Sequence, residues 1–336
     1  MEYNVNVAVL IDAGLWDRYS SMVAPLNHRA RRGLVKRKIT EAFSHIMNGV
    51  SMRYKGIEDP SISIGVFLSD FIFFERESDF PHKSSKVMNH NGTKFIEMIS
   101  YLEDLAIWDL ETGQNHLPFF DQAMLFTGYN LYRDSLSDVD SHGASYTDGV
   151  CEIAARSSVI QAVDYIWTVW ATAHELGHSL GANHDGENKG IACKAEDLYI
   201  MTPSVPYMYP GWPYSRNPWM FSNCSVETFK QTLKDKDCLK TKGNYFNNGD
   251  YNTIVMKQPG ETRTHNEQCH AIKGPKSVLC ETAAADICLL MRCTDPATGI
   301  CLEEYFGAAS GTTCGYNMWC IEGRCVSKFQ NVGNQL

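Results

Sequence analysis

The amino-acid sequence predicts a mixed α/β domain followed by a small disulfide-rich module. Segments with strand-like and helix-like apolar patterns alternate over roughly the first 240 residues, as in a twisted, mostly parallel sheet covered by helices. A chain of 336 residues also exceeds the usual size of a single hydrophobic core. The 12 cysteines divide the chain as well, because none precedes Cys151 and eight lie between Cys269 and Cys325. We therefore expect an α/β domain at residues 1–245, a linker at 246–264 and a cysteine-rich module at 265–336.

The first part of the α/β domain shows two strands and two helices. Asn4–Asp12 alternates and then becomes continuously apolar, which is typical of a central strand. Apolar residues recur at helical spacing from Arg29 to Met52 and predict a long amphipathic helix. Ser61–Phe74 is rich in Ile, Val and Phe and predicts a second strand. A second helical pattern at Phe95–Trp108 completes this part of the domain.

The second part of the domain leads to the segment with the strongest functional signal. Asp121–Tyr129 is expected to form a strand, followed by a polar loop through Asp140. Ala144–Tyr146 predicts a short edge strand, and Ser157–Ala162 predicts a further strand or a loop. The next helix is expected at about Tyr165–Leu180, crossing the sheet.

The segment from residue 173 to 185 reads A-H-E-L-G-H-S-L-G-A-N-H-D and predicts a zinc site. His174 and His178 are four residues apart, so both imidazoles project from one face of a helix. Gly181 can adopt the left-handed conformation that ends a helix, and His184 can then return to supply a third nitrogen. Glu175 lies beside the histidines but is rotated away from direct ligation. The alternative is a surface helix that carries histidines by chance, but the extended motif favours zinc with one open position.

A methionine and an aromatic segment follow the histidines. Met201 lies in the sequence Y-I-M-T-P and is expected to form an apolar floor beneath the three imidazoles. The alternative is an ordinary core methionine, which the nearby histidine motif makes less favourable. The segment Pro203–Trp219 is dense in Pro, Tyr and Trp and is expected to line a pocket beside the metal.

The cysteines and the net charge indicate the kind of environment in which the chain acts. Eight cysteines in a short C-terminal region predict a disulfide scaffold, and hence secretion into an oxidising compartment. A cysteine-based metal cluster would require close C-x-x-C pairs, and the sequence has none. Sequence alone allows about 105 pairings of eight cysteines. The net charge of −9 argues against nucleic acid as a partner, and no apolar run approaches the ~18 residues of a membrane span.

These motifs resemble those of a known family. The extended histidine motif with Met201 behind it is similar to the metzincin zinc endopeptidases, and Asp185 after the third histidine resembles the adamalysin, or reprolysin, branch. The spacing of the last eight cysteines, with Gly311–Cys314 and Trp319–Cys325 as the nearest local matches, resembles the disintegrin-like module of relatives with thrombospondin motifs. No thrombospondin repeat follows in this sequence. The resemblance implies a metzincin catalytic domain joined to a disintegrin-like module.

The resemblance also implies a set of disulfides. In the protease part it implies two bridges, and in the small module four. The implied pairs are Cys151 with Cys238, Cys193 with Cys224, Cys269 with Cys293, Cys280 with Cys301, Cys288 with Cys320 and Cys314 with Cys325. Such bridges typically contribute about 2 to 4 kcal/mol each, and a module this small depends on them for its fold.

A structural calcium is a further implication of the resemblance. The relatives use an acidic residue in the first strand, an aspartate before the fourth strand, and oxygens after the last cysteine of the protease part. The matching positions are Asn6, Asp121, Cys238 and Thr241. Calcium binds through several hard oxygen ligands, usually including more than one carboxylate. Asn6 stands where the relatives have an acid, so calcium binding is expected to be weaker here than in them.

Together these features predict a secreted, monomeric zinc endopeptidase that hydrolyses extracellular proteins. Glu175 is the expected general base that takes a proton from the attacking water. An extended substrate is expected to pair with the edge at Ala144, Ser145 and Tyr146, and Pro203 begins a wall that would accept one side chain. The alternative is a binding protein whose disintegrin-like module engages receptors or matrix while the protease part serves as a scaffold. The sequence contains no R-G-D, and a scaffold has no physical need for Glu175.

Overall fold

The computed structural model describes residues 1–23, 27–81, 83–112, 120–136, 142–203, 216–242, 257–280, 286–303 and 307–329. Within these residues, the main feature is a five-stranded sheet in the order β2-β1-β5-β8-β7. The strands are β1 (Glu2–Ile11), β2 (Ser63–Phe73), β5 (Gln122–Thr127), β7 (Gly143–Ser145) and β8 (Ser157–Gln161). The first four in the sheet order are parallel, and β7 is antiparallel to β8 at the edge. The predicted mixed, mostly parallel sheet is therefore confirmed.

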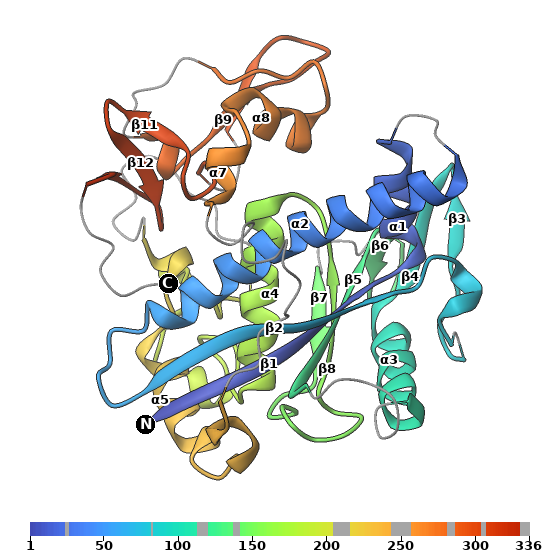
Figure 1. Cartoon of the computed structure of the whole chain (residues 1–336). Coiled ribbons are helices and arrows are strands. Elements are labelled where there is room, and N and C mark those ends of the chain that lie inside the picture. The colour runs from blue at the N-terminus through green and yellow to red at the C-terminus, as the bar shows by residue number, and fades with distance from the viewer. Residues whose placement is uncertain are drawn as a thin grey trace.

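Helices cover both faces of this sheet (Figure 1). The α2 (His28–Lys55) and α4 (Tyr165–Ser179) helices pack on one face, where they share a core with Val5, Val7 and Val9 of β1. The α3 helix (Met98–Thr112) packs on the other face. Successive side chains of a strand point to opposite faces, so β1 contributes to both cores and has the nearly continuous apolar sequence of a central strand.

Two local features differ from the sequence prediction. A helix α1 (Ala13–Ser21) follows β1 directly, because the Asp12 carboxylate accepts a hydrogen bond of 2.7 Å from the Leu15 backbone N–H and caps it. The α3 helix begins at Met98 and not at Phe95. The preceding residues form β4 (Thr93–Glu97), which pairs with β3 (Met88–His90) and with β6 (Asn130–Tyr132) in the segment predicted to be a polar loop.

The remaining elements of the α/β domain are short. They are α5 (Asn223–Leu233), η1 (Glu77–Asp79), η2 (Asn188–Gly190), η3 (Ala195–Asp197), η4 (Asn217–Trp219) and η5 (Asp237–Lys240). The C-terminal module contains α7 (Pro259–Thr262), α8 (His265–Lys273), η6 (Asp286–Cys288), β9 (Arg292–Thr294), β10 (Cys301–Glu303), β11 (Thr313–Gly315), β12 (Met318–Ile321) and β13 (Arg324–Ser327). The α7 helix lies in the segment assigned to the linker, yet it contacts the module, since Gly260 N donates to Ser310 O at 2.8 Å.

Six disulfides tie the fold together, and they join the pairs that the family resemblance implies. Two lie in the catalytic part, where Cys193–Cys224 connects the segment after the histidine motif to the start of α5. Four lie in the module, whose core consists largely of half-cystines with Ile287, Met291 and Ala308. With so few large apolar side chains, the module depends on its disulfides for stability.

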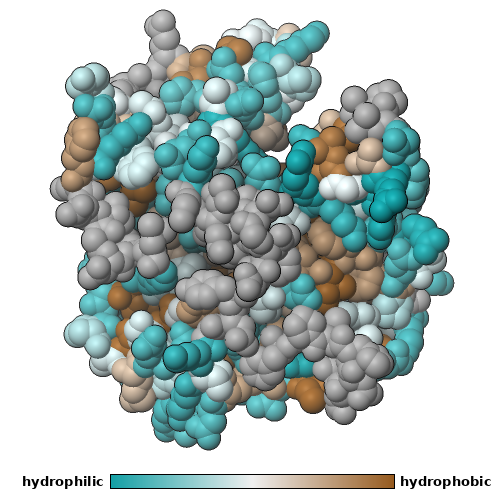
Figure 2. Space-filling model, in the orientation of Figure 1, coloured by the Kyte–Doolittle hydropathy of each residue, from teal (hydrophilic) through white to brown (hydrophobic). Residues whose placement is uncertain are grey.

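Much of the molecular face in Figure 2 is hydrophilic where the structure describes it, with smaller hydrophobic patches between the polar side chains. Among the described residues, no helix has both the length and the apolar character needed to cross a bilayer.

Candidate metal centre and active site

The α4 helix positions the first two histidines of the predicted zinc site. Asp164 caps its N-terminus by accepting a hydrogen bond of 2.9 Å from Trp167 N. Just after the helix lies Gly181, whose φ of +100° is in the left-handed region, and a Cβ at this position would lie 2.4 Å from Thr232 Oγ1. Glycine is therefore required both by conformation and by space. The chain reverses after Gly181 and brings His184 back toward the helix.

The three histidines converge as the spacing predicts. The Nε2 atoms of His174 and His178 are 3.1 Å apart, and His184 Nε2 lies 3.3 Å from the first and 3.2 Å from the second. Tetrahedral zinc with bonds of about 2.0–2.1 Å places two nitrogen ligands ~3.3 Å apart. The three imidazoles therefore fit a zinc ion and leave one coordination position for water or substrate.

The opposite ring nitrogen of each histidine faces an oxygen. His174 Nδ1 lies 2.7 Å from Ile200 O, and His178 Nδ1 lies 2.8 Å from Ala182 O. His184 Nδ1 is 3.4 Å from Glu187 Oε2. These acceptors favour a proton on Nδ1, which leaves the Nε2 lone pairs directed toward the common point. The chain thus orients all three ligands with groups of its own.

Glu175 is placed between the helix and the edge strand. Its side chain is only 5% exposed, and among the described residues its Oε2 atom has no hydrogen-bond partner. Gly143 of β7 lies directly against it, since a Cβ on Gly143 would be 2.7 Å from Glu175 Oε1. A hydrogen bond from the Ser145 side chain also reaches this carboxylate. The absence of a side chain at Gly143 therefore makes room for Glu175 beside the metal ligands.

The segment after the histidines packs against α4. Met201 is fully buried, and a Cβ on Gly177 of α4 would lie 2.5 Å from its Sδ atom. Asp185 N donates to Met201 O at 2.9 Å, and the Ser222 hydroxyl donates to Asp185 Oδ1 at 2.6 Å. Asp185 therefore ties the third histidine to the Met201 turn and to the N-terminus of α5.

Burial sets the electrostatics of the site. Desolvation raises the pKa of Glu175 to about 8, and the Ser145 hydrogen bond acts in the opposite direction. Desolvation, together with the charge of His184, lowers the pKa of His178 to about 4, and it lowers the pKa of His174 well below the usual value. His174 and His178 are therefore neutral at physiological pH, as metal ligands must be. The pKa of Asp185 is raised to about 6 by desolvation, which the Ser222 hydrogen bond partly offsets.

The structure describes only some of the residues that are predicted to bind substrate. Ala144 and Ser145 belong to β7, the last strand in the order of the described sheet, and Tyr146 follows it. The inner side of β7 pairs with β8, for example Ala144 with Val159. Pro203 is exposed just after the Met201 turn, but most of the predicted pocket wall, residues 204–215, lies outside the described residues.

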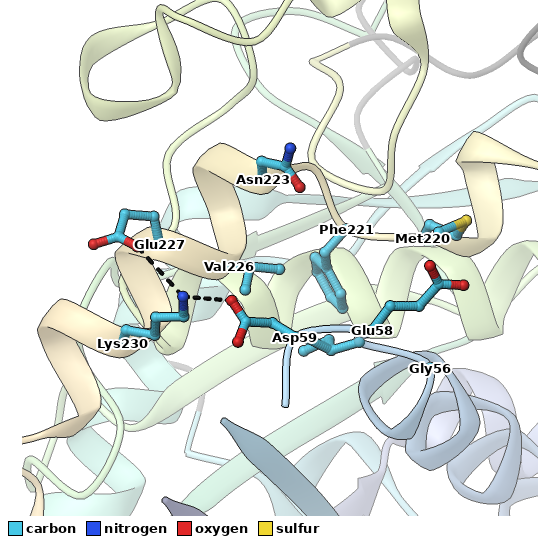
Figure 3. Close-up of a pocket in the computed structure, with 10 residues that line it drawn as sticks. Gly56, Glu58, Asp59, Met220, Phe221, Asn223, Val226, Glu227 and Lys230 are labelled. Carbon is cyan, nitrogen blue, oxygen red and sulfur yellow. Dashed lines mark ion pairs between the residues drawn. The ribbon is translucent and has the colours of Figure 1, made fainter. Parts of the chain in front are cut away.

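A separate pocket of about 450 Å³ lies between the segment after α2 and the start of α5, with Asp59, Phe221 and Lys230 among its lining residues (Figure 3). Phe221 separates it from α4, because a Cβ on Gly177 would lie 3.4 Å from the Phe221 ring. Three of its charged side chains form ion pairs: Lys230 Nζ lies 2.5 Å from Asp59 and 3.6 Å from Glu227. This pocket therefore does not contribute to the histidine site.

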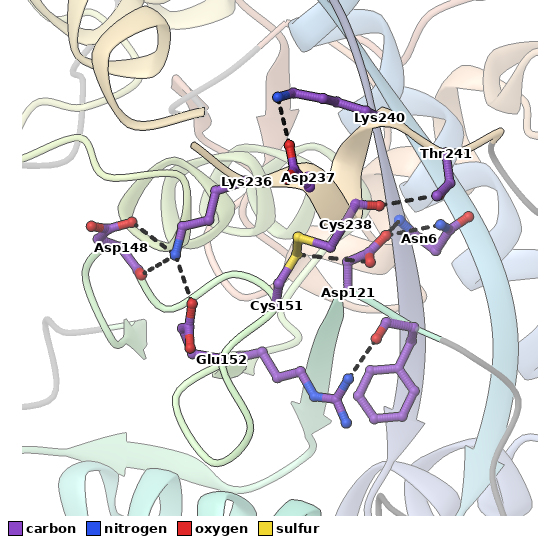
Figure 4. The surroundings of a disulfide bond; sticks show 12 residues. Asn6, Asp121, Asp148, Cys151, Glu152, Lys236, Asp237, Cys238, Lys240 and Thr241 are labelled. Carbon is purple, nitrogen blue, oxygen red and sulfur yellow. Dashed lines mark hydrogen bonds and ion pairs between the residues drawn. A yellow bond between two sulfur atoms is a disulfide. The ribbon is translucent and has the colours of Figure 1, made fainter. Parts of the chain in front are cut away.

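The positions expected to bind calcium surround the Cys151–Cys238 disulfide (Figure 4). Here N–H and O–H donors bond to several of the oxygens that calcium would use. Asn6 donates both its backbone N–H and its side-chain amide to Asp121 Oδ2, each at 2.8 Å. Thr241 Oγ1 donates to Cys238 O at 3.1 Å, and the Thr241 carbonyl accepts from Asn4 Nδ2 at 2.9 Å. With Asp121 as the one carboxylate among these positions, the donor set does not fit calcium.

We expect the stability of this chain to be independent of calcium. If calcium bound to the folded chain, a free calcium concentration of about 100 times the dissociation constant would stabilise the fold by about 2.7 kcal/mol. The Asn6 amide already donates a hydrogen bond to the Asp121 carboxylate. Adding calcium or a calcium chelator should therefore leave the melting temperature unchanged. The comparison variant Asn6→Asp supplies a second carboxylate and should become calcium-dependent. A calcium-induced rise in the melting temperature of the unmodified chain would contradict this assignment.

Some functional contacts could not be read from sequence. Gly143 and Ser222 touch Glu175 and Asp185 from distant parts of the chain, and neither belongs to a recognisable local motif. The carbonyl partners of His174 and His178 are backbone groups, which leave no sequence signal at all. One available clue was the isolated glycine beside the predicted edge strand, since a glycine in a strand often marks a close approach.

Comparisons with known proteins agree with this geometry. The profile of the reprolysin (M12B) family of zinc metalloproteases matches residues 95–242. The profile of the ADAMTS cysteine-rich domain 2 matches residues 259–326. The first match contains the whole histidine site and Met201, and the second contains all eight cysteines of the module.

Similar proteins share both regions. The chain is 25% identical to a protein of Bombyx mori described as "a disintegrin and metalloproteinase with thrombospondin motifs like", covering 88% of this chain and 42% of that protein. It is 28% identical to "a disintegrin and metalloproteinase with thrombospondin motifs 18" of Homo sapiens, covering 89% of this chain and 22% of that protein. The chain thus spans less than half the length of these relatives. A solved archaemetzincin from Methanopyrus kandleri is 14% identical with a TM-score of 0.33, covering 69% of this chain and 96% of that one, too low a similarity to support an inference.

Proposed function

Because the chain carries a reprolysin (M12B) family zinc metalloprotease domain followed by an ADAMTS cysteine-rich domain 2, we propose that it is a secreted zinc endopeptidase. Its substrates on this proposal are extracellular proteins. The observation that carries the proposal is the convergence of three Nε2 atoms within 3.3 Å of one another, with the Glu175 carboxylate beside them. His174, His178 and His184 would hold the metal.

The chemistry of peptide hydrolysis divides between the metal and the protein. Bound zinc supplies a Lewis acid that polarises a peptide carbonyl and makes a water molecule more acidic. The Glu175 carboxylate accepts the proton of that water and passes it to the nitrogen of the leaving amine. The positive charge of the metal favours the ionised carboxylate, opposing the desolvation that raises its pKa. Gly143 leaves the carboxylate the space for this role.

The edge strand β7 is the proposed substrate platform. Its three residues pair with β8 on one side, and β7 ends the described sheet on the other. An extended peptide that pairs with this edge uses backbone hydrogen bonds, which suits an enzyme that cuts chains of varied sequence. Ala144, Ser145 and Tyr146 would contact the substrate there, and Pro203 would begin the opposite wall.

The six disulfides support an extracellular setting, because such bonds persist in oxidising compartments. A cleavage assay tests the proposed activity. An unfolded extracellular protein should be cut by the zinc-loaded chain, the activity should be lost with a zinc chelator, and it should return when zinc is restored. Cleavage that persists in the chelator, or a zinc-loaded chain that cuts nothing, would overturn the proposal.

Zinc binding should depend on pH in a defined direction. The pKa of His178 is lowered to about 4 in the fold, against about 6.5 for an unperturbed histidine. Because the pKa is lowered in the fold, His178 is fully neutral above about pH 6.5 and becomes protonated as the pH falls through about 4. Zinc binding needs the neutral imidazole, so it should be lost over the same fall in pH. Zinc content measured after dialysis at a series of pH values checks this. Zinc retained well below pH 4 would contradict the three-histidine assignment.

A further inference from the structure

The tip of a hairpin in the C-terminal module reaches the catalytic part of the molecule, whose α2 helix lies beside the module in Figure 1. Strands β12 and β13 are joined by Glu322 and Gly323, with φ values of +49° and +71°. Positive φ at both residues is typical of a tight two-residue turn and favours glycine at the second position. Such a turn holds Glu322 in a fixed direction relative to the disulfide-bonded hairpin.

This turn fits against two catalytic-domain residues. The Glu322 carboxylate forms an ion pair with Arg53 of α2, a side chain that is only 7% exposed. The backbone of Gly323 lies under Trp219, because a Cβ there would be 3.0–3.1 Å from three atoms of the indole ring. The Arg53 guanidinium also lies 5.8 Å from the centre of that ring. We call Arg53, Trp219, Glu322 and Gly323 the hairpin clamp.

The clamp is adjacent to the groups that orient the zinc ligands. Next to Trp219, Met220 O accepts a hydrogen bond of 2.9 Å from Ile200 N. The carbonyl of the same Ile200 accepts from His174 Nδ1 at 2.7 Å. One short path of backbone contacts therefore leads from the clamp to the first zinc ligand.

A second path leaves the clamp on its other side. Tyr54 follows Arg53 in α2 and is completely buried. Its hydroxyl donates to Ala173 O at 2.8 Å, directly before His174 in the zinc helix. Its ring also packs against Phe221 at a centroid distance of 4.7 Å. Each half of the clamp thus adjoins a residue that bonds to the backbone beside His174: Met220 bonds to Ile200, and Tyr54 bonds to Ala173.

We propose that Glu322 is a positioning residue for the active site, because its pairing with Arg53 holds Trp219 and the end of α2 in the places that orient His174. The inference rests on the proposed zinc endopeptidase function. It makes the cysteine-rich module part of the catalytic architecture. Groups bonded directly to a metal ligand typically change metal affinity by about 10- to 100-fold when they are lost, and Glu322 acts on one such group, the Ile200 carbonyl, through the intervening clamp residues.

The test is Glu322→Gln in the full chain, with zinc affinity in a metal buffer, kcat and KM on a peptide, and melting temperature as readouts. Because Glu322 acts through several intervening contacts, we expect zinc affinity and kcat each to fall by about three- to tenfold, with a smaller change in KM. The matched control is Glu75→Gln, which removes an exposed ion pair with Arg32 near the opposite end of the same α2 helix. The control should leave zinc affinity and kcat within about twofold of the unmodified chain.

A charge exchange tests the pair itself. Arg53→Glu and Glu322→Arg should each lower zinc affinity, and the double variant should recover a large part of it, because the opposite charges are restored. A fall in melting temperature with unchanged zinc affinity and kcat would overturn the proposal and leave the clamp a purely structural contact. Since zinc affinity is measured without substrate, an unmodified chain that binds zinc but cleaves nothing would refute the proposed function alone.

Discussion

Replacing Glu175 by glutamine is expected to lower kcat for peptide hydrolysis by about a thousandfold. Glutamine keeps the size of the side chain but cannot accept the proton of the attacking water. The three histidines remain, so zinc binding should be retained. Because desolvation raises the pKa of Glu175 in the metal-free fold, a neutral side chain in its place should not lower the melting temperature of the metal-free protein. Steady-state kinetics, zinc analysis and thermal unfolding measure the three effects.

These readouts separate a proton carrier from a structural residue. Loss of zinc together with activity would show that Glu175 holds the metal site, and turnover within about tenfold of the unmodified chain would exclude it as the general base. The comparison variant is His178→Ala, which should lose both activity and zinc because it removes a ligand.

The second large effect is expected from Gly143→Ala. The added Cβ would lie 2.7 Å from Oε1 and 2.8 Å from Cγ of Glu175, so the carboxylate must rotate away from its position. The far end of a side chain can move at little cost in stability, but a displaced base no longer reaches the water. We expect kcat to fall by about 10- to 100-fold with zinc content unchanged. Kinetics and zinc analysis of the purified variant check this.

A glycine elsewhere provides the control. A Cβ on Gly33 in α2 meets nothing within 4 Å, and alanine is favoured over glycine inside a helix by roughly 0.5–1 kcal/mol. Gly33→Ala should therefore raise stability slightly and leave kcat unchanged. Equal losses of activity in both variants, or full activity in Gly143→Ala, would show that the contact with Glu175 has no catalytic role.

The sequence was sufficient for the parts of the site that depend on local spacing. His174 and His178 converge because four residues make about one helical turn, and His184 returns because Gly181 ends the helix. The sheet was likewise predictable, since β1 and β5 carry continuous apolar runs. The missed elements have weak local patterns. The α1 helix depends on the Asp12 cap, and β6 is only three residues long and pairs with β4.

Contacts between distant segments could not be predicted from sequence. Gly143 meets Glu175 only because the sheet order places β7 beside β8, and β7 lies against α4. Arg53 and Glu322 belong to the first long helix and the last hairpin, and each looks like an ordinary surface charge in its local sequence. In the sequence, Asn6 is only a position that matches a calcium ligand, and its hydrogen bond to Asp121 becomes visible only in the folded structure. Such roles emerge only when the chain is folded.

If substrates add to the short antiparallel strand β7 as proposed, this has a consequence for which parts of a folded protein could be cut. A peptide that adds to an edge strand must first give up its own helix or sheet, because its backbone N–H and C=O groups cannot serve two partners at once. The local unfolding free energy of the target is then part of the barrier to cleavage. Folded proteins would be cut first in their loosest loops and termini, with flexibility selecting the site before any side-chain pocket does.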